Sequence, residues 1–343
     1  MPRTTGVRRI SRTKLYMSAV LILSGAFGFG HHSWVRTADL GSMSDAAETA
    51  VDLALRCGQS MRSASASQRK KALKDSNAKA GGIDPVTETD VANERLITEG
   101  LRARFPGHAI VGEEAVSAAA SALQAVDPAV PTWFVDPIDG TQNFVKRLPL
   151  SCVSIGLCIG GTPTLGVIFD PWHDELWVGV ADGAQPGLAY MNGGHICAAD
   201  AACTRLQDAI VCTDLGYERS PEGVPRLAGA HAALLDANTF GIRILGSTAL
   251  SLAWVASGRA NAFYSGLATR DCPKPWDWCA GAALGAAAGV SFRRLDGDRK
   301  FTFAAPSGLC CAGSPELADE LERTLLPVIT SSTEHVSSTR RAH

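Results

Sequence analysis

The stretch "WFVDPIDGTQNF", residues 133–144, places two aspartates three residues apart, directly after a run that a folded protein would bury. The run "TWFV" fits a buried strand, and Pro137 cannot donate a hydrogen bond to a sheet ladder. We therefore expect the chain to leave the sheet at about Asp136. Asp136 and Asp139 would then lie on a turn at a sheet edge, with the carbonyl of Ile138 free to point the same way.

Three oxygen ligands within four residues favour Mg²⁺, which prefers carboxylates, carbonyls and water. An alternative is that the two aspartates only form a turn and cap a helix, which is common for Asp-Pro and Asp-Gly pairs. The next residues favour the metal. Gly140 permits close backbone approach, and residues 141–144 can begin a helix whose free N–H groups would bind a phosphate. The Thr141 hydroxyl could also orient an attacking water.

Further carboxylates occur at the ends of predicted elements. Glu113 follows the short strand in "HAIVGEE", Asp90 is a candidate N-cap of the helix in "DPVTETDVANERLITEGLRARF", and Asp277 is a candidate N-cap of the helix "WCAGAALGAAAG". Carboxylates a few ångströms apart cannot all stay ionised unless cations neutralise them. Two cations sharing Asp136 would do so, and they would also polarise a phosphate and activate water. The residues therefore predict a metal-assisted phosphatase.

Composition limits the classes of partner. The chain has 343 residues, of which 46% are apolar and 19% charged, and its formal net charge is −2. This chain is long enough for one large domain or for two halves that share a site. The charge balance argues against nucleic acid and favours a small-molecule partner.

The ten cysteines are spread along the chain, with no CxxC pair, and the eight histidines form no HxxxH or HxH pair. This spacing argues against zinc and predicts buried free thiols in a reducing compartment. We therefore expect a cytoplasmic protein.

Residues 1–42 are treated as a separate N-terminal extension. Residues 1–38 contain no acidic residue, and residues 15–30 are uncharged. These features fit a signal sequence or an organellar transit peptide. A third interpretation, which we favour, is a translation start at Met43, because a soluble amphipathic helix with Ser44 as its N-cap is predicted from there. The tail, residues 331–343, is expected to be disordered.

Strands and helices alternate between these ends, which predicts a layered α/β or α+β enzyme. The runs "CVSIGLCIGG", "TLGVIFD" and "ELWVGVAD" predict a meander of antiparallel strands. Later, "DAIVCTD" predicts a strand, "GSTALSLAWVASGRANAFY" a helix that runs into a strand, and "WDWCAGAALGAAAGV" another helix. We expect one domain over residues 43–330, with a metal-binding half at 43–190 and a substrate-contacting half at 191–330.

Four ordered blocks, "DPVTETD", "GEE", "WFVDPIDGTQNF" and "WDWCAG", closely resemble those of the inositol monophosphatase family, within the lithium-sensitive, Mg²⁺-dependent phosphatase superfamily. The resemblance extends from Met43 to about Pro327. It implies a five-layer αβαβα sandwich, a homodimer and inhibition by lithium.

The resemblance also implies metal ligands. Glu113, Asp136 and the Ile138 carbonyl would hold a first Mg²⁺. Asp136, Asp139 and Asp277 would hold a second. A third, weaker Mg²⁺ site near Glu113 is usual in the family.

By the same resemblance, Glu113 and Thr141 would activate the nucleophilic water, and Asp90 would orient Thr141. The amides of Gly140 and Thr141 would receive the phosphate.

The sugar or cyclitol would contact a segment that begins a helix. Its members are Gly246, Ser247, Thr248 and Ala249. Inositol-specific members of the family place a glutamate seven residues before the last metal aspartate, and here that position is Arg270. The segment is longer than usual, so Asp271 competes for the role. An Asp271 carboxylate could accept two hydroxyl donors, whereas Arg270 would favour a second anionic group. A third alternative is an exposed turn in which neither residue touches the ligand.

Our hypothesis is a phosphomonoesterase that hydrolyses inositol monophosphates to inositol and phosphate by metal-activated water. Histidinol phosphate, fructose 1,6-bisphosphate or another small phosphate ester is the alternative substrate. A catalytically silent binding protein is the rival from another class, and it would be expected to have lost one of the metal or catalytic residues. All of those residues are present. We expect no stable membrane association of the catalytic domain.

Overall fold

The computed structural model describes residues 43–67, 77–79, 84–117, 127–181, 187–198, 203–268, 270–295 and 308–330. These residues belong to one compact unit, Val35–His343. The expectations for residues 1–42 and 331–343 lie outside the described residues. Within the described residues, no helix is long and apolar enough to cross a membrane.

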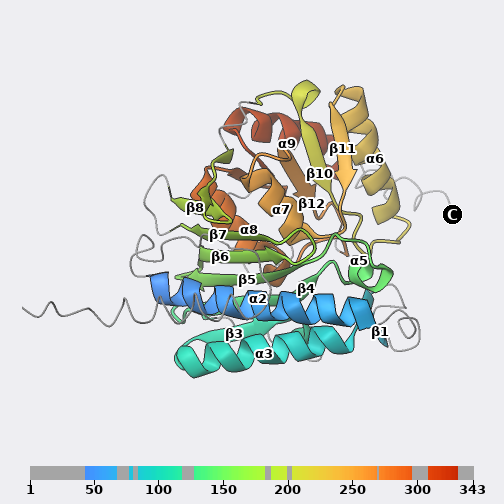
Figure 1. Cartoon of the computed structure of the whole chain (residues 1–343). Helices are drawn as coiled ribbons and strands as arrows, with labels where there is room; N and C mark the ends of the chain where they lie inside the picture. The colour runs from blue at the N-terminus through green and yellow to red at the C-terminus, as the bar shows by residue number, and fades with distance from the viewer. Residues whose placement is uncertain are drawn as a thin grey trace, which may run out of the picture. The chain divides into compact units, whose positions relative to one another are not determined.

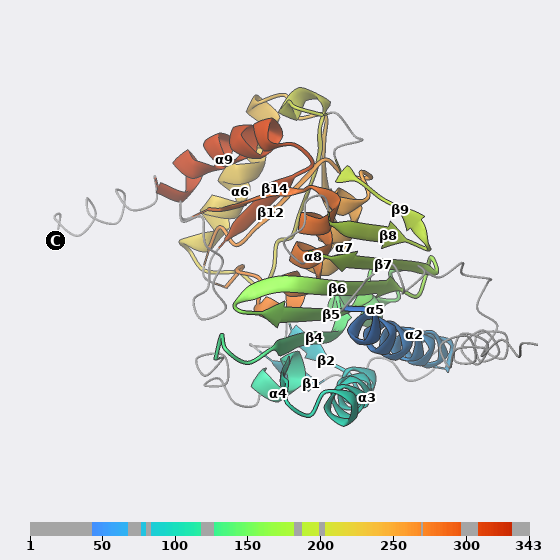
Figure 2. The same cartoon turned by 90° about the vertical axis from the view of Figure 1, so that its left-hand side faces the viewer.

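The larger sheet has seven strands in the order β3-β4-β5-β6-β7-β8-β9, of which Figure 1 labels β3 and Figure 2 labels β4 to β9. Its strands are β3 (Ala109–Gly112), β4 (Thr132–Asp139), β5 (Cys152–Ile159), β6 (Thr162–Asp170), β7 (Glu175–Val180), β8 (Leu188–Met191) and β9 (Gly194–His195). Strands β3 and β4 are parallel, and each later pair is antiparallel. The meander predicted from the apolar runs is confirmed.

The second sheet has five strands in the order β11-β10-β12-β14-β13. Its strands are β10 (Ile210–Thr213), β11 (Gly241–Ile244), β12 (Ala262–Ser265), β13 (Ser291–Arg294) and β14 (Leu309–Ala312). Strand β10 pairs in parallel with β11 and β12, whereas β14 pairs antiparallel with β12 and β13. A separate hairpin joins β1 (Asn77–Lys79) and β2 (Asp84–Val86).

Helices form three layers around these two sheets (Figure 1). The seven-stranded sheet is covered on its outer face by α2 (Ser44–Ser67) and α3 (Glu88–Arg104). Between the sheets lie α7 (Thr248–Ala256) and α8 (Pro275–Ala288). The five-stranded sheet is covered by α6 (Gly223–Asp236) and α9 (Pro315–Thr330). Short helices are α4 (Glu113–Ser117), α5 (Thr141–Lys146) and η6 (Leu206–Asp208). The described residues therefore form the αβαβα sandwich that the resemblance implied.

A row of glycines lets α8 approach the seven-stranded sheet closely. Gly156, Gly166 and Gly179 are register neighbours on β5, β6 and β7. A Cβ atom at Gly166 would lie 2.0 Å from the carbonyl oxygen of Ala280 on α8, and one at Gly179 would lie 2.4 Å from the Cα of Leu284. Because the helix backbone occupies the space that side chains would fill, its position on the sheet is closely fixed.

Strand β4 continues beyond the point where the sequence predicts its end. The chain does not leave the sheet at Asp136, because Asp139 still pairs with Cys152 after a bulge that begins at Asp136. Strand β3 ends opposite Val135, so the last residues of β4 have a partner strand on one side only. Pro137 therefore occupies a bulged edge segment, where its missing N–H is tolerated.

All ten cysteines carry free thiols, and seven of them are buried, as the sequence predicted. Burial raises the pKa of the Cys152 and Cys279 thiols well above the ordinary value. These cysteines behave as small apolar core residues.

Candidate active site

Three aspartates converge where the end of β4 meets the first turn of α8. Each of Asp136, Asp139 and Asp277 offers a carboxylate oxygen that lies within 4.8 Å of the other two. Asp136 and Asp139 are buried, and Asp277 is half-buried. The cluster joins residues that are far apart in the sequence, as the resemblance implied.

Burial and mutual repulsion disfavour the ionised forms of these aspartates. Burial, reinforced by the charges of Glu113, Asp139 and Asp277, raises the pKa of Asp136 well above its ordinary value. Burial also raises the pKa of Asp139 to about 6, and burial with the charge of Asp139 raises that of Asp277 to about 8. Such a set of hard oxygen donors fits a divalent cation such as Mg²⁺, whose charge would allow all the carboxyls to ionise.

The N-terminus of α7 holds one oxygen of Asp139. The Ser247 hydroxyl and the Ala249 amide both donate to Oδ2 of Asp139, the amide at 2.7 Å. The Cys152 thiol lies 3.8 Å from the same oxygen. An aspartate on the seven-stranded sheet is thereby fixed by the helix layer between the sheets.

The turn after β4 connects the cluster to Thr141. The Ile138 amide donates to Oδ1 of Asp136 at 2.9 Å, and the Ile138 carbonyl accepts from the Thr141 hydroxyl at 2.9 Å. That hydroxyl also lies 3.3 Å from Oδ1 of Asp90 on α3. The structure thus brings together the Asp90, Thr141 and Ile138 groups that the sequence singled out.

The prediction that Asp90 and Asp277 are N-caps is wrong, because both occupy the third position of their helices. Thr87 and Lys274 are the N-caps, each with extended backbone. The Thr87 amide donates to Asp90 at 2.9 Å, and the Lys274 amide donates to Asp277 at 2.6 Å. An acid at the third position can reach back to the cap in this way. Burial raises the pKa of Asp90 to about 6, although the bonds from Thr87 oppose that shift.

Glu113 begins α4, immediately after β3. Its charge contributes to the raised pKa of Asp136, so it acts on the cluster.

Glu94, a residue that the sequence reasoning missed, supports helix α4. Glu94 of α3 accepts from the Glu114 amide at 2.6 Å and from the Ala115 amide at 2.9 Å. Its spacing of four residues from Asp90 was the available signal, because that spacing places both acids on one helix face.

Gly140 forms the tight turn between β4 and α5. Its φ of 88° lies in the left-handed region. A Cβ atom there would lie 2.8 Å from the Leu150 carbonyl oxygen and 3.0 Å from that of Gly246. Only glycine combines this conformation with so close an approach. Thr141 is buried at the first position of α5, so the predicted phosphate-binding amides belong to this turn.

The predicted substrate segment is anchored by buried carboxylates. Besides the Ser247 bond to Asp139, the Gly246 amide donates to Oδ1 of Asp214 at 2.9 Å, and the Thr248 hydroxyl donates to its Oδ2 at 3.0 Å. Burial raises the pKa of Asp214. The sequence reasoning missed this anchoring role. The hydroxyls of Ser247 and Thr248, two residues of the segment expected to contact the substrate, both donate to carboxylates of the fold.

Arg270 and Asp271 have different surroundings. Arg270 is exposed, whereas Asp271 is only 4% exposed. The Asp271 carboxylate accepts from the amides of Gly266 and Leu267 at 3.1 and 3.3 Å. Burial raises its pKa to about 7. Asp271 therefore stabilises the loop between β12 and α8.

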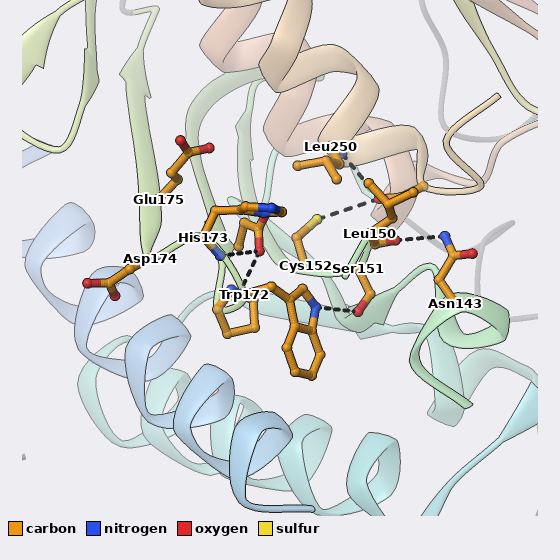
Figure 3. A network of polar contacts seen from close by, with 12 residues as sticks. Asn143, Leu150, Ser151, Cys152, Trp172, His173, Asp174, Glu175 and Leu250 are labelled. Atoms are coloured by element: carbon orange, nitrogen blue, oxygen red, sulfur yellow. Dashed lines mark hydrogen bonds and ion pairs between the residues drawn. The ribbon is translucent and has the colours of Figure 1, made fainter. Parts of the chain in front are cut away.

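A polar network connects Asn143 of α5 with residues 150–152 and with Leu250 of α7 (Figure 3). The Asn143 side-chain amide donates to the carbonyls of Leu150 and Leu245, each at 2.7 Å. The Trp172 indole N–H donates to the Ser151 hydroxyl at 2.9 Å. Sequence reasoning did not assign this role to Asn143, because its partners are backbone atoms that only the fold brings near.

The αβαβα sandwich and the acidic cluster at the junction of β4 and α8 together indicate a metal-dependent phosphatase. A sequence model of the inositol monophosphatase family matches residues 42–332, and the chain belongs to that family.

Relatives and solved structures agree with this assignment. The chain is 38% identical over 244 residues to inositol monophosphatase 1 of Solanum lycopersicum, covering 71% of this chain and 82% of the relative. It is 38% identical over 224 residues to inositol monophosphatase 2 of Homo sapiens, covering 65% and 73%. The structure of inositol monophosphatase from Anabaena matches with a TM-score of 0.64 at 28% identity, covering 82% of this chain and 94% of that one. A Thermotoga maritima structure shares the fold, with a TM-score of 0.66 at 24% identity and coverage of 83% and 98%.

Proposed function

We propose that this protein is a Mg²⁺-dependent phosphomonoesterase that hydrolyses inositol monophosphates to inositol and phosphate. The observation that carries the proposal is the convergence of Asp136, Asp139 and Asp277 within 4.8 Å. Membership of the family and relatives named inositol monophosphatase support the choice of substrate.

The metal ligands in this proposal are those that the sequence indicated. Glu113, Asp136 and the Ile138 carbonyl would hold one Mg²⁺, and Asp136, Asp139 and Asp277 would hold the second. A third, weaker ion near Glu113 is part of the same proposal. When bound, Mg²⁺ neutralises the carboxylates, polarises a phosphate and lowers the pKa of a coordinated water.

The side chains around the cluster would position the nucleophile. The Thr141 hydroxyl donates its single proton toward Ile138 or Asp90, which leaves its oxygen free to accept a hydrogen bond from a water. Asp90 is held in place by the Thr87 amide, so the carboxylate beside the Thr141 hydroxyl has a fixed position. Glu113 would accept the proton that the attacking water loses.

The turn at Gly140 would bind the phosphate. The left-handed conformation of Gly140 allows the chain to turn sharply into α5, where the Gly140 and Thr141 amides would donate to phosphate oxygens. The water and the phosphorus would then be held on adjacent groups of one turn, which favours direct attack.

The alcohol portion of the ester is expected to contact residues 246–249. The Ser247 and Thr248 hydroxyls and the Gly246 and Ala249 amides already donate to carboxylates, so any of these groups that contacts the ester would have to share or exchange its hydrogen bond. A specific observation favours a second candidate function. Because Arg270 is exposed while Asp271 is buried, the loop offers a cation to the solvent. That arrangement favours an ester with a second anionic group, such as fructose 1,6-bisphosphate. Histidinol phosphate and other small phosphate esters belong to the same test.

The remaining features of the proposal rest on the family resemblance and the composition. They are a homodimer, inhibition by lithium, a cytoplasmic location and no binding to nucleic acid. The division into a metal-binding half, 43–190, and a substrate-contacting half, 191–330, also stays a proposal. Light scattering after size-exclusion chromatography would test the dimer.

A substrate panel tests the choice of ester. Phosphate release is measured at equal concentrations of inositol 1-phosphate, histidinol phosphate and fructose 1,6-bisphosphate, with wild type and Arg270→Ala. The proposal predicts the highest kcat/KM for inositol 1-phosphate and little effect of Arg270→Ala on it. A preference for the bisphosphate that disappears in Arg270→Ala would establish the second candidate instead.

A further inference from the structure

Helix α3 carries two buried acids one turn apart. Asp90 is fully buried and Glu94 is 7% exposed. Residues four apart lie on the same helix face, so both carboxylates face the same neighbours. Asp90 reaches the Thr141 hydroxyl, and Glu94 reaches the start of α4. The two groups that the proposed function uses to activate water, Thr141 and Glu113, are therefore both approached from one face of α3.

Both oxygens of the Glu94 carboxylate are bound to the backbone of α4. Oε2 accepts from the Glu114 amide at 2.6 Å, and Oε1 accepts from the Ala115 amide at 2.9 Å. These are the second and third residues of the helix, whose amides have no partner within it. Two bonds to one rigid carboxylate fix both the place and the direction of this turn. Glu113 directly precedes the two bound amides, so its backbone is fixed with them.

A second observation concerns Gly112, the last residue of β3. A Cβ atom at Gly112 would lie 2.5 Å from Cδ of Glu94, and 2.6 and 2.8 Å from its two oxygens. The Glu94 carboxylate thus fills the space beside the junction of β3 and α4. The absence of a side chain at Gly112 is what allows Glu94 to reach the amides.

Placing a buried carboxylate here costs desolvation energy, which the two amide bonds offset. The helix that Glu94 caps, α4, contributes Val116 to a buried cluster, so the cap supports the core as well. Glu113, the residue next to the two bound amides, also carries a charge that acts on Asp136 in the acidic cluster.

We propose that Glu94 is a positioning residue that holds Glu113 toward the acidic cluster and so sets the affinity for Mg²⁺. The inference rests on the proposed function, in which Glu113 is a metal ligand. It assigns to Glu94 no contact with substrate or metal. Partners that orient a metal ligand typically alter metal affinity by about 10- to 100-fold when they are changed.

Three variants of the full-length protein test the inference. Glu94→Gln keeps one acceptor oxygen but turns an NH₂ group toward a backbone N–H. Glu94→Ala removes both acceptors. Gly112→Ala leaves Glu94 intact and displaces it sterically. The matched control is Glu99→Gln on the same helix, because the Glu99 side chain is 61% exposed and pairs only with Arg95 among the ion pairs of the described residues.

Two readouts separate positioning from stability. Titration calorimetry measures Mg²⁺ binding without substrate, and the assay of phosphate release gives the Mg²⁺ concentration for half-maximal rate, together with kcat and KM. We expect Glu94→Gln and Gly112→Ala to weaken Mg²⁺ binding about tenfold or more with KM for the ester little changed. Glu99→Gln should match wild type in both.

The result that overturns the inference is wild-type Mg²⁺ affinity in folded Glu94→Gln and Gly112→Ala, whether or not their melting temperatures fall. If Glu94→Ala does not fold, these two variants still decide the question. A wild-type protein that neither binds Mg²⁺ nor releases phosphate would overturn the proposed function, and the inference with it. Wild-type Mg²⁺ binding without phosphate release would reject only the activity.

Discussion

Replacing Gly166 with alanine should push helix α8 away from the sheet. The new Cβ would lie 2.0 Å from the Ala280 carbonyl oxygen and 2.8 Å from its carbonyl carbon, both of which are backbone atoms. Contacts under 3.0 Å are essentially never made by real Cβ atoms, so the separation must grow by at least about 1 Å. A flexible side chain could rotate away, but a helix backbone cannot. The helix must shift as a body, and Asp277 lies one turn from Ala280.

The displacement sets the expected magnitudes. Overpacking a core typically costs about 1–3 kcal/mol, and a backbone clash belongs at the upper end, about 3 kcal/mol. For a domain of this size, that corresponds to a fall in melting temperature of roughly 5 °C. The ligand oxygens of the cluster lie within 4.8 Å of one another, so a 1 Å shift of Asp277 changes the cluster substantially. Misplacement of about 1 Å can cost about 100-fold in rate.

Calorimetric melting and phosphate release in Mg²⁺ measure the two effects on the same preparation. Gly107→Ala is the matched control, because a Cβ atom there would meet nothing within 4 Å. It should melt within about 2 °C of wild type. If Gly166→Ala melts at the wild-type temperature and keeps wild-type activity, then Gly166 is not required for the close packing of α8 on the sheet.

Three further predictions concern single contacts. Arg259 forms a bidentate ion pair with Glu175, and its guanidinium lies 5.8 Å from the centre of the Trp177 ring. Arg259→Ala should therefore lower the free energy of unfolding, measured in urea, by about 1–2 kcal/mol. An unchanged free energy of unfolding would contradict this prediction. Burial raises the pKa of Asp271 to about 7 from 3.8, so its stabilising contribution is present at acid pH and is lost as pH rises through about 7. Asp271→Asn should therefore reduce the fall in stability between about pH 5 and about pH 8, measured by urea unfolding in chelator, and an unchanged pH slope would reject this role. Thr141→Val, which removes the hydroxyl, should lower kcat by about 100-fold, whereas Thr141→Ser should keep kcat within about tenfold of the wild-type value. Equal kcat values for the two variants would exclude the hydroxyl from catalysis.

The local part of the site could be predicted from the sequence because its groups are neighbours in the chain. A buried strand that ends in "DPIDG" places Asp136, Asp139 and the Ile138 carbonyl together, whatever the rest of the fold. The error about where β4 ends has a local cause as well. Pro137 breaks a ladder only where a partner strand requires its N–H, and the pairing of β3 stops opposite Val135.

The tertiary part of the site could not be predicted from local pattern. Asp277 was assigned through the family resemblance, because nothing in the sequence around it specifies which strand end its helix will approach. The glycines at 156, 166 and 179 that seat this helix have meaning only once the register of three strands is known. The same holds for Glu94 and Asp214, whose partners are backbone amides brought near by folding.

The antiparallel meander and the alternation of helices with strands were visible in the sequence because hydrophobic periodicity and turn residues mark them. Capping positions were less well predicted. Asp90 and Asp277 were placed at the N-cap because aspartate favours that position, but an acid is also favourable at the third position of a helix, where both residues lie.

The most direct test of the central claim is the Mg²⁺ dependence of phosphate release from inositol 1-phosphate by the full-length protein. Wild type, Asp139→Asn and Asp277→Asn are freed of metal with chelator and then titrated with Mg²⁺. The account predicts no turnover in chelator, restored turnover in the wild type, and, in both variants, Mg²⁺ activation weakened by about tenfold or more. Turnover at the wild-type rate in chelator, or unchanged Mg²⁺ activation in either variant, would contradict the assignment of the acidic cluster as the metal site.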